Sequence, residues 1–469
     1  MDKRYAIILA AGKGTRMKSL RQDISKVSFP ILGIPLVKYV TNALKPLNLE
    51  KIVTVVGFGG EISSNIVKDD TEIVWQKEQK GTGHAVMMAT PILGKEKGET
   101  IICCGDTPLL RTETLSGLFE AHEKEGNSMT VMTSILTNPF GYGRIHKENG
   151  SVDRIIEEKD CSSEEKKINE VNAGVYVFDN ELLFEALSHL TTNNASGEYY
   201  LTDVLAYFVK NGNKVGSFPV ADVDETLGVN DRYQLSIAAK IIRERINKTL
   251  MVSGVTVEDP DTTYIAPGVK IGQDSVIRPG TFILGNTTIG TGNVIGPNTY
   301  LEDDTIGNDN EIIYSHLTET IIDNGTTLGP YLRARAHTHI TDKAHIGNFN
   351  ELKNVTFGAG SKCAHLSYLG DASIGSGVNV GCGTIIANYD GVNKFHSDIG
   401  DNVFLGSGST LISPVKVESG AFIAAGSTIN HDVHSGDMAI ARARQEEKPG
   451  YAKVLHEKAL KKKELMGKK

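Results

Sequence analysis

Glycine and basic residues gather near the start of the chain, directly after an apolar run. Tyr5–Ala11 has the length and composition of a buried strand, and it leads into the loop Leu-Ala-Ala-Gly-Lys-Gly-Thr-Arg-Met over residues 9–17. The two glycines of this loop expose backbone N–H groups without Cβ atoms, and such a turn can hold phosphate oxygens. Arg16 and Lys26 add positive charge. The segment therefore predicts a phosphate-binding loop rather than a simple turn.

Polar side chains stand where two further apolar runs end. Ile101–Cys104 runs into Gly105-Asp106, and a carboxylate at such a strand tip can bind Mg²⁺ that bridges phosphate oxygens. Asp106 could instead cap the next helix; the upstream loop favours the metal. Gln76 precedes Gly81 and Thr82. An amide beside free backbone groups suits a flat, hydrogen-bonding base, although an ordinary strand-to-helix connection would also use glycine.

Apolar runs of strand length alternate with helix-compatible stretches through the first half. A helical period covers Pro35–Leu47, and further strand-length runs are Ile52–Val56, Ile73–Trp75, Thr100–Cys104, Met129–Leu136 and Val175–Phe178. This alternation predicts an α/β, Rossmann-like domain with a mostly parallel sheet and helices on both faces. Ligands of such sheets bind beyond the carboxyl ends of the strands, where the phosphate loop lies.

The composition changes after a helical period over Arg232–Lys248. An aliphatic residue then recurs every six positions from Ile265 to Leu301; the phase slips and resumes over Leu328–Leu352, Ile374–Ile386 and Ile399–Ile429. Hexapeptide repeats are typical of a parallel β-helix, here with about eighteen residues per turn and roughly ten turns. The stretch Asn388–His396 interrupts the repeat. Insertions in such folds become loops on one face, often the binding face.

Composition limits the class of partner. The formal net charge of −8 argues against nucleic acid or a membrane surface as the main partner. The five cysteines lack CxxC spacing, which favours reduced thiols and a cytoplasmic location. No apolar run approaches the length of a membrane span.

The loop over residues 9–17, followed by Lys26, resembles the signature of sugar-nucleotide pyrophosphorylases, although Ser25 stands where that family usually has Pro. With Gly141–Ile145, Asn172–Val175 and Gly197–Asp203, the first half resembles one branch: bifunctional N-acetylglucosamine-1-phosphate uridylyltransferase/glucosamine-1-phosphate acetyltransferase. Hexapeptide helices that resemble the second half are left-handed acyltransferases that form homotrimers. The family supplies a precursor of peptidoglycan and lipopolysaccharide.

The resemblance implies roles for residues of the first half. Arg16 and Lys26 are expected to be catalytic, and Asp106 and Asn230 to bind Mg²⁺. The nucleotide and sugar are expected to be bound by Leu9, Ala10, Ala11, Gly12, Lys26, Gln76, Gly81, Thr82, Gly141, Glu157, Asn172 and Asn230.

The resemblance also implies roles in the second half, where His365 is expected to be the general base. A lone His in a β-helix is usually a surface residue, and only the surrounding pattern favours this role. Cys382 stands where the family usually has Ala, and Ala336 where Pro is common. The sugar phosphate is expected at Arg335, Lys353, Tyr368, Asn379 and Lys394, and acetyl-CoA at Cys382, Asn388, Tyr389, Ser407, Ala425 and Arg442.

The sequence thus predicts an enzyme that makes UDP-N-acetylglucosamine from acetyl-CoA, glucosamine 1-phosphate and UTP. Its expected parts are a uridylyltransferase domain over 1–230, a linker helix over 231–251, and an acetyltransferase β-helix with a basic tail over 252–469. Two alternatives stay open. A single-function pyrophosphorylase would carry a structural or regulatory β-helix, and a non-catalytic assembly protein would tolerate loss of Lys26, Asp106 or Asn230.

Overall fold

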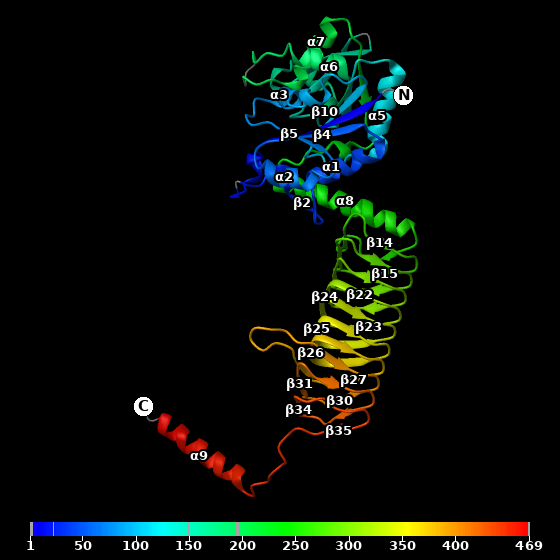
Figure 1. Ribbon diagram of the computed structural model, residues 1–469. Coiled ribbons are helices and arrows are strands. Elements are labelled where there is room, and N and C mark those ends of the chain that lie inside the picture. Colours follow the sequence, from blue (N-terminus) through cyan, green and yellow to red (C-terminus); the bar gives the residue numbers. More distant parts are fainter. Residues whose placement is uncertain (1–2, 22, 149, 194–196, 468–469) are drawn as a thin grey trace. The chain divides into compact units, whose positions relative to one another are not determined.

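The computed structural model describes residues 3–21, 23–148, 150–193 and 197–467 (Figure 1). The chain divides into two compact units, Met1–Ser253 with Pro260–Val269, and Gly254–Asp259 with Lys270–Lys469. Within the described ranges, no helix is both long enough and apolar enough to cross a bilayer.

The first unit is built on a mixed sheet. Its strands are β1 (Arg4–Ala10), β4 (Lys51–Val56), β5 (Glu72–Trp75), β6 (Glu99–Cys104), β7 (Met129–Ile135), β8 (Arg144–Glu148), β9 (Ser151–Ile156), β10 (Glu170–Asp179) and β11 (Val215–Pro219). The order is β11-β7-β10-β6-β1-β4-β5, and a small separate hairpin joins β2 (Pro30–Ile31) to β3 (Ile34–Pro35).

Strand direction agrees with the prediction in most of this sheet. β6, β1, β4 and β5 run parallel, as do β7 and β11. Two strands run in the other direction: β10 is antiparallel to β6, β7 and β8, and β9 is antiparallel to β8. The parallel part contains β1 and β6, whose carboxyl ends lead into the phosphate loop and Asp106.

Helices cover both faces of the sheet, as predicted. They are α1 (Leu36–Leu44), α2 (Gly60–Val67), α3 (Thr82–Met87), α4 (Thr90–Leu93), α5 (Thr112–Glu125), α6 (Asn180–Leu187) and α7 (Val204–Lys210). The long helix α8 (Arg232–Val252) packs instead beside β2, where Ala238 and Ile242 share a small core with Ile31. Alternate residues of β1 point to opposite faces. Tyr5 and Ile7 pack in a core with residues of α3, α6 and α7, whereas Ala6 and Ile8 pack with α1 and α5.

The second unit is a β-helix of short strands stacked in parallel coils, followed by α9 (Tyr451–Met466). Its strands are β12 (Thr256–Val257), β14 (Lys270–Ile271), β15 (Val276–Ile277), β16 (Phe282–Leu284), β17 (Thr288–Ile289), β18 (Val294–Ile295), β19 (Tyr300–Glu302), β20 (Thr305–Ile306), β21 (Glu311–Ile312), β22 (His316–Ile322), β23 (Thr327–Leu328), β24 (Arg333–Ile340), β25 (His345–Phe357), β26 (Lys362–Ile374), β27 (Asn379–Val380), β28 (Ile385–Ala387), β29 (Ser397–Ile399), β30 (Phe404–Leu405), β31 (Thr410–Ile412), β32 (Lys416–Val417), β33 (Phe422–Ile423), β34 (Thr428–Ile429) and β35 (Met438–Ala439). The short strand β13 (Tyr264–Ile265) lies in the Pro260–Val269 segment of the first unit.

Coil length explains where the six-residue phase slips. Paired residues are 18 positions apart at Val276 and Val294, but 16 apart at Thr305 and Ile321. The coils shorten there while their aliphatic residues stay inside, since Ile306, Ile312 and Leu317 are buried. The β-helix therefore continues through the segment in which the sequence pattern is irregular.

Candidate active sites

The phosphate loop is shaped by one glycine. Gly14 has a left-handed backbone (φ +59°), and a Cβ built on it would lie 2.5 Å from the Cβ of Lys26. A side chain at this position would therefore be strained and would displace Lys26. Gly12, in contrast, has no neighbour within 4 Å of such a Cβ. The close approach at Gly14 brings Lys26 against the loop.

Four predicted residues from distant parts of the chain converge on one point. The Lys26 ammonium forms an ion pair with Asp106 and donates to Asn230 Oδ1 at 3.1 Å. Arg16 Nη2 donates to the same oxygen at 2.8 Å. A backbone hydrogen bond from Val229 N to Asp106 O (2.8 Å) ties the two segments together. The predicted cations and oxygen ligands thus form a single cluster.

The residues of this cluster fit a magnesium ion. Helix α5 has Arg111 at its N-cap, so Asp106 does not cap it. The Asp106 carboxylate and the Asn230 amide oxygen both approach one cationic group, and both are hard oxygen donors. The described residues contain no group of three or more His, Cys, Asp or Glu suited to a metal. The donor set therefore suits Mg²⁺, which keeps substrate phosphates and water among its ligands.

A cavity of about 290 Å³ lies beside this cluster, and it is lined by predicted residues from the loop, from the end of β5 and from the tip of β6. The members that were predicted are Leu9, Ala10, Ala11, Gly12, Lys26, Gln76, Gly81, Thr82 and Asp106. Gln76 Nε2 donates to Gly81 O and approaches His84 Nδ1, each at 3.0 Å. Both amide hydrogens are thereby directed at protein groups, which leaves the Gln76 oxygen to accept from a ligand.

A second cavity, of about 700 Å³, shares Leu9, Thr82 and Cys104 with the first. The predicted Glu157 lines it, together with Tyr176, which the sequence analysis did not single out. Asn172 Nδ2 donates to the Tyr176 hydroxyl at 2.8 Å, so it lies next to this cavity. The N–H of Gly141 donates to Glu158 at 3.2 Å, and Gly141 lines neither cavity.

Ser25 is held in place by hydroxyl groups. Its side chain is fully buried, and its Oγ hydrogen bonds with Ser28 Oγ (3.0 Å) and Ser63 Oγ (2.5 Å). These contacts anchor the segment before Lys26 where the resembling family usually has a rigid Pro.

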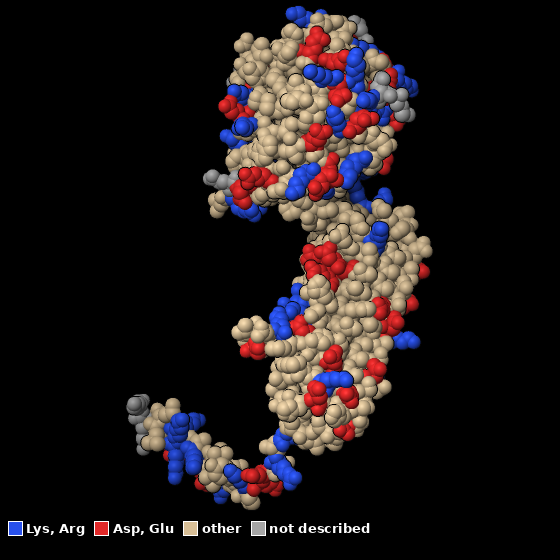
Figure 2. Space-filling model, viewed as in Figure 1, with Lys and Arg blue, Asp and Glu red and all other residues tan. Residues whose placement is uncertain are grey.

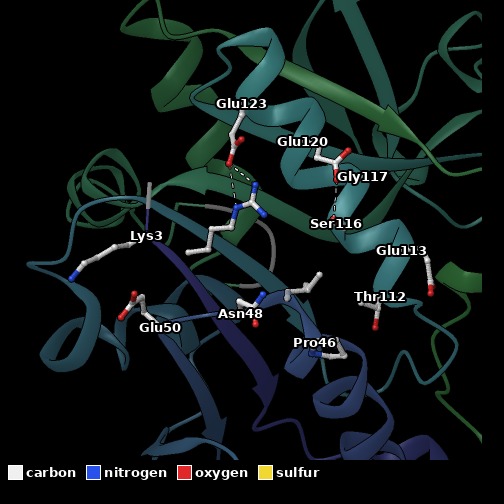
Figure 3. A pocket seen from close by; sticks show the side chains of 12 residues that line it. Lys3, Pro46, Asn48, Glu50, Thr112, Glu113, Ser116, Gly117, Glu120 and Glu123 are labelled. Carbon is white, nitrogen blue, oxygen red and sulfur yellow. Dashed lines mark hydrogen bonds and ion pairs between the residues drawn. The ribbon is translucent and has the colours of Figure 1, made fainter. Parts of the chain in front are cut away.

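A larger cavity, of about 990 Å³, lies near the start of β1 and along α5 (Figure 3). It is therefore at the opposite edge of the sheet from the phosphate loop. Two cations, Lys3 and Arg4, line it, and Arg4 is already paired with Glu123. Four carboxylates surround them: Glu50, Glu113, Glu120 and Glu123. This excess of negative charge disfavours phosphate-bearing substrates.

In the β-helix, His365 is oriented by the coil before it. His365 Nδ1 and Asn348 Oδ1 are 3.2 Å apart, and the two residues are register partners in β26 and β25. An amide oxygen can only accept, so in the neutral imidazole the proton lies on Nδ1 and Nε2 keeps its lone pair. Asn348 was not predicted; its position 17 residues before His365, one coil away, is the signal that could have found it.

The interruption of the repeat is a hairpin, as the sequence predicts for an insertion. Register partners are 25 residues apart across it, at Asn379 and Phe404, and Tyr389 pairs with Lys394 in an antiparallel bridge. The hairpin brings Lys394 close to Lys353. Lys394 lowers the pKa of Lys353, and burial lowers it further. Figure 2 shows Lys and Arg side chains gathered beside this hairpin, and two adjacent ammonium groups suit a bound phosphate.

Predicted residues for acetyl-CoA follow one corner of successive coils. Gly383 N donates to Leu366 O, Gly408 N to Cys382 O, and Gly426 N to Ser407 O, at 2.7–2.8 Å. The next coil brings Arg442 near Gly426. The predicted acetyl-CoA residues at this corner are Cys382, Ser407, Ala425 and Arg442. The first contact in this series is made by Leu366, the residue that follows His365.

Two predicted residues differ in their surroundings. Arg335 is the register partner of Lys353, although its guanidinium donates to Glu351 at 2.6 Å. Asn379 pairs with Lys362 on another flat face of the coil. Among the described residues, no hydrogen bond or ion pair joins Asn379 to Lys353 or Tyr368.

Fold and sites together define a nucleotidyltransferase unit joined to a hexapeptide-repeat β-helix. Residues 5–226 match the nucleotidyl transferase family model, and residues 268–303 and 396–431 match the bacterial transferase hexapeptide (six repeats) model. Bifunctional protein GlmU of Geobacillus sp. (strain WCH70) is 48% identical over 96% of this chain and 98% of its own. The same name belongs to relatives from Streptococcus agalactiae (48%; 96% and 97%) and Halalkalibacterium halodurans (48%; 96% and 99%).

The chain belongs to the family of bifunctional GlmU proteins. This confirms the resemblance found in the sequence, the prediction of an enzyme with two transferase functions, and the fold of an α/β nucleotidyltransferase domain followed by a left-handed β-helix. A solved UDP-glucose pyrophosphorylase complexed with UDP-glucose matches 52% of this chain and all of its own, at 20% identity and a TM-score of 0.42, which is too low to carry an argument.

Proposed function

We propose that the two units perform consecutive reactions. Residues 252–469 acetylate glucosamine 1-phosphate with acetyl-CoA, residues 1–230 couple the product to UTP, and 231–251 link them. UDP-N-acetylglucosamine and pyrophosphate are the final products. The β-helix acts as a homotrimer, as the resembling hexapeptide-repeat acyltransferases do, and in such an assembly a neighbouring copy would complete a sugar-phosphate site at Asn379. The predicted cytoplasmic location fits these small-molecule substrates.

In the acetyl transfer, the amine of glucosamine 1-phosphate attacks the thioester carbonyl of acetyl-CoA. His365 Nε2 accepts the proton that the nitrogen loses, because its Nδ1–H is already donated to Asn348. The C–S bond breaks, and CoA leaves as the thiolate, which takes up a proton. Lys353 and Lys394 bind the sugar phosphate, and the corner from Cys382 to Arg442 binds CoA.

In the uridylyl transfer, a phosphate oxygen of N-acetylglucosamine 1-phosphate attacks the α-phosphorus of UTP and displaces pyrophosphate. Lys26, Arg16 and the N–H groups of the phosphate loop bind the phosphates and neutralise the charge that develops. Asp106 and Asn230 would hold Mg²⁺, which when bound supplies charge neutralisation between phosphate oxygens.

The hydrogen bonds of Gln76 favour binding of a uracil base over a cytosine base. Its amide nitrogen is engaged with Gly81 and His84, so the amide oxygen is the group that faces a ligand. Uracil carries an imino N–H that can donate to this oxygen, whereas the same ring atom of cytosine can only accept.

The observation that carries the acetyltransferase function is the hydrogen bond between His365 Nδ1 and Asn348 Oδ1, because it holds the ring in the tautomer whose Nε2 can accept a proton. The test is CoA release, followed with a thiol reagent, from acetyl-CoA and glucosamine 1-phosphate without UTP. Release supports two activities. Silence, with pyrophosphate still formed from N-acetylglucosamine 1-phosphate and UTP, would reduce the β-helix to a structural or regulatory part.

A further inference from the structure

Asp371 is a buried carboxylate between residues assigned to different substrates. It lies on β26, is 8% exposed, and has a left-handed backbone (φ +49°), which Asp tolerates better than most residues. Asn354 Nδ2 donates to its Oδ1 at 2.7 Å, and Asn388 Nδ2 donates to its Oδ2. The Lys353 ammonium lies 3.9 Å from Oδ2. One side chain therefore contacts three others.

These contacts come from three successive coils. Asn354 lies 17 residues before Asp371, and Asn388 lies 17 residues after it. Lys353 belongs to the proposed sugar-phosphate site, whereas Asn388 opens the hairpin and belongs to the proposed acetyl-CoA site. Asp371 is therefore the carboxylate that both substrate sites share.

The neighbouring glycine shows how tightly this region is packed. A Cβ on Gly370 would lie 2.6 Å from the Tyr368 hydroxyl and 2.8 Å from Asn388 Nδ2. Only glycine leaves room for both side chains, so Tyr368 and Asn388 lie together over the backbone that precedes Asp371. A small displacement of Asn388 would be felt by Tyr368.

The charges around Asp371 support an ionised carboxylate. Burial raises its pKa, but hydrogen bonds from Asn354 and Asn388 and the charges of Lys353 and Lys394 outweigh burial, and the pKa lies below its usual range. The carboxylate acts in return on Lys353, where it opposes the lowering of the pKa caused by Lys394 and by burial. It thus helps to keep the Lys353 ammonium charged.

We propose that Asp371 is a positioning residue that couples the two substrate sites of acetyl transfer, because its carboxylate fixes the Lys353 ammonium and the Asn388 amide at the same time. The proposal rests on the acetyltransferase function proposed above. Asp371 acts through these neighbours and does not itself touch the reacting atoms.

The test is Asp371→Asn in the full chain. The carboxamide of the variant has one oxygen to accept from three donors, Asn354, Asn388 and Lys353. Its NH₂ group must therefore face one of these donors, and that contact is lost. The KM for glucosamine 1-phosphate and the KM for acetyl-CoA should each rise roughly tenfold or more, as expected when catalytic groups are misplaced by a fraction of an ångström. Pyrophosphate formation by the other unit should not change.

A reciprocal exchange separates positioning from general support of the fold. In Asp371→Asn/Asn354→Asp, the new Asn can accept from Asn388 and donate to the new Asp, and the cluster regains one negative charge. Most of the loss in both KM values should be recovered. The matched control is Asp304→Asn, which removes another fully buried carboxylate of the β-helix and should leave both KM values within twofold.

Three results would overturn the proposal: both KM values unchanged in Asp371→Asn, a change in only one of them, or a loss that the exchange does not recover and that follows a fall in melting temperature. If the wild-type chain releases no CoA, the proposed acetyltransferase function itself fails. If the wild-type chain releases CoA and the Asp371→Asn variant has unchanged KM values, the positioning role of Asp371 is refuted and the acetyltransferase function stands.

Discussion

The two candidate sites are assembled in opposite ways. The site of the first unit joins Arg16, Lys26, Asp106 and Asn230, which are up to 214 residues apart and come from separate loops at one sheet edge. The site of the second unit is built from contacts between neighbouring coils of the β-helix. His365 contacts Asn348, and Asp371 contacts Asn388; the partners in each pair are 17 residues apart, which is one coil. A loop-built site depends on backbone shape, and a coil-built site depends on register.

This difference predicts how each site fails. A change in the first unit should stop uridylyl transfer without affecting the coils, and a change in one coil should stop acetyl transfer without affecting the loops. Variants that break both activities at once would show that the comparison is wrong.

The largest effect is expected for His365→Ala. Loss of a general base should lower CoA release roughly 10²- to 10⁴-fold, while pyrophosphate formation from N-acetylglucosamine 1-phosphate and UTP persists. His339→Ala is the control, because His339 is a surface histidine of the same β-helix that lies 3.0 Å from Asp323. Acetyl transfer that survives in His365→Ala would assign the base to another residue.

Asp106→Ala should have the next largest effect. It removes a proposed metal ligand and leaves Lys26 without its carboxylate, so uridylyl transfer should fall roughly 10²- to 10³-fold. CoA release should be unchanged. The matched control is Asp70→Ala, whose carboxylate pairs with two other lysines of the same unit, Lys38 and Lys45. A similar loss in both variants would point to folding rather than to phosphate chemistry.

Gly14→Ala tests the loop backbone. The left-handed conformation costs an alanine roughly 1–2 kcal/mol, and the new Cβ would displace Lys26, so uridylyl transfer should fall about tenfold, as expected for a misplaced catalytic group. Gly33→Ala has a similar backbone cost (φ +81°) but meets no atom within 4 Å. Steady-state kinetics of the two variants separate two effects: Gly33→Ala adds only backbone strain, whereas Gly14→Ala adds backbone strain and displaces Lys26. Equal activity in both would show that Lys26 is not positioned by Gly14.

Asp304 gives the β-helix a pH dependence. Burial raises the pKa of this carboxyl to about 7. Because the folded pKa is above the unfolded value near 3.9, the stability that Asp304 contributes is present at low pH and is lost as pH rises through about 7. The melting temperature of wild type relative to Asp304→Asn should therefore fall between pH 5 and pH 8. A difference that stays constant with pH would contradict the prediction.

Cys382→Ala should have the smallest effect on basal activity. Cys is little larger than Ala and apolar when protonated, so CoA release should change no more than about twofold. Cys382 is exposed whereas Cys103 and Cys363 are buried, so treatment with peroxide should inhibit CoA release in wild type and spare the variant. Equal inhibition of both would place the sensitive thiol elsewhere.

The repeats predicted the β-helix because each aliphatic residue of the pattern is buried at a fixed interval, as Ile277, Ile283 and Ile295 are. The shortened coils between Leu301 and Leu328 escaped the six-residue pattern, since loops at the corners can lose residues without exposing the core. The antiparallel direction of β10 also escaped, because an apolar run carries no signal of strand direction.

The sequence predicted the site residues that belong to a recognisable motif. It did not predict the residues that hold these side chains in place. Asn348 and Asp371 act on neighbours one coil away, so their contacts follow from register and not from local sequence. Tyr176 was missed for a related reason: it contacts Asn172 across the bulge where the pairing of β10 with β7 shifts register.

The most direct test of two independent sites in one chain is complementation between separately purified His365→Ala and Asp106→Ala variants. The substrates are glucosamine 1-phosphate, acetyl-CoA, UTP and Mg²⁺, and the product measured is UDP-N-acetylglucosamine. Neither variant alone should form it, and a mixture should, because N-acetylglucosamine 1-phosphate made by one variant diffuses to the other. A mixture that forms no product, although each variant retains its single activity, would contradict the account.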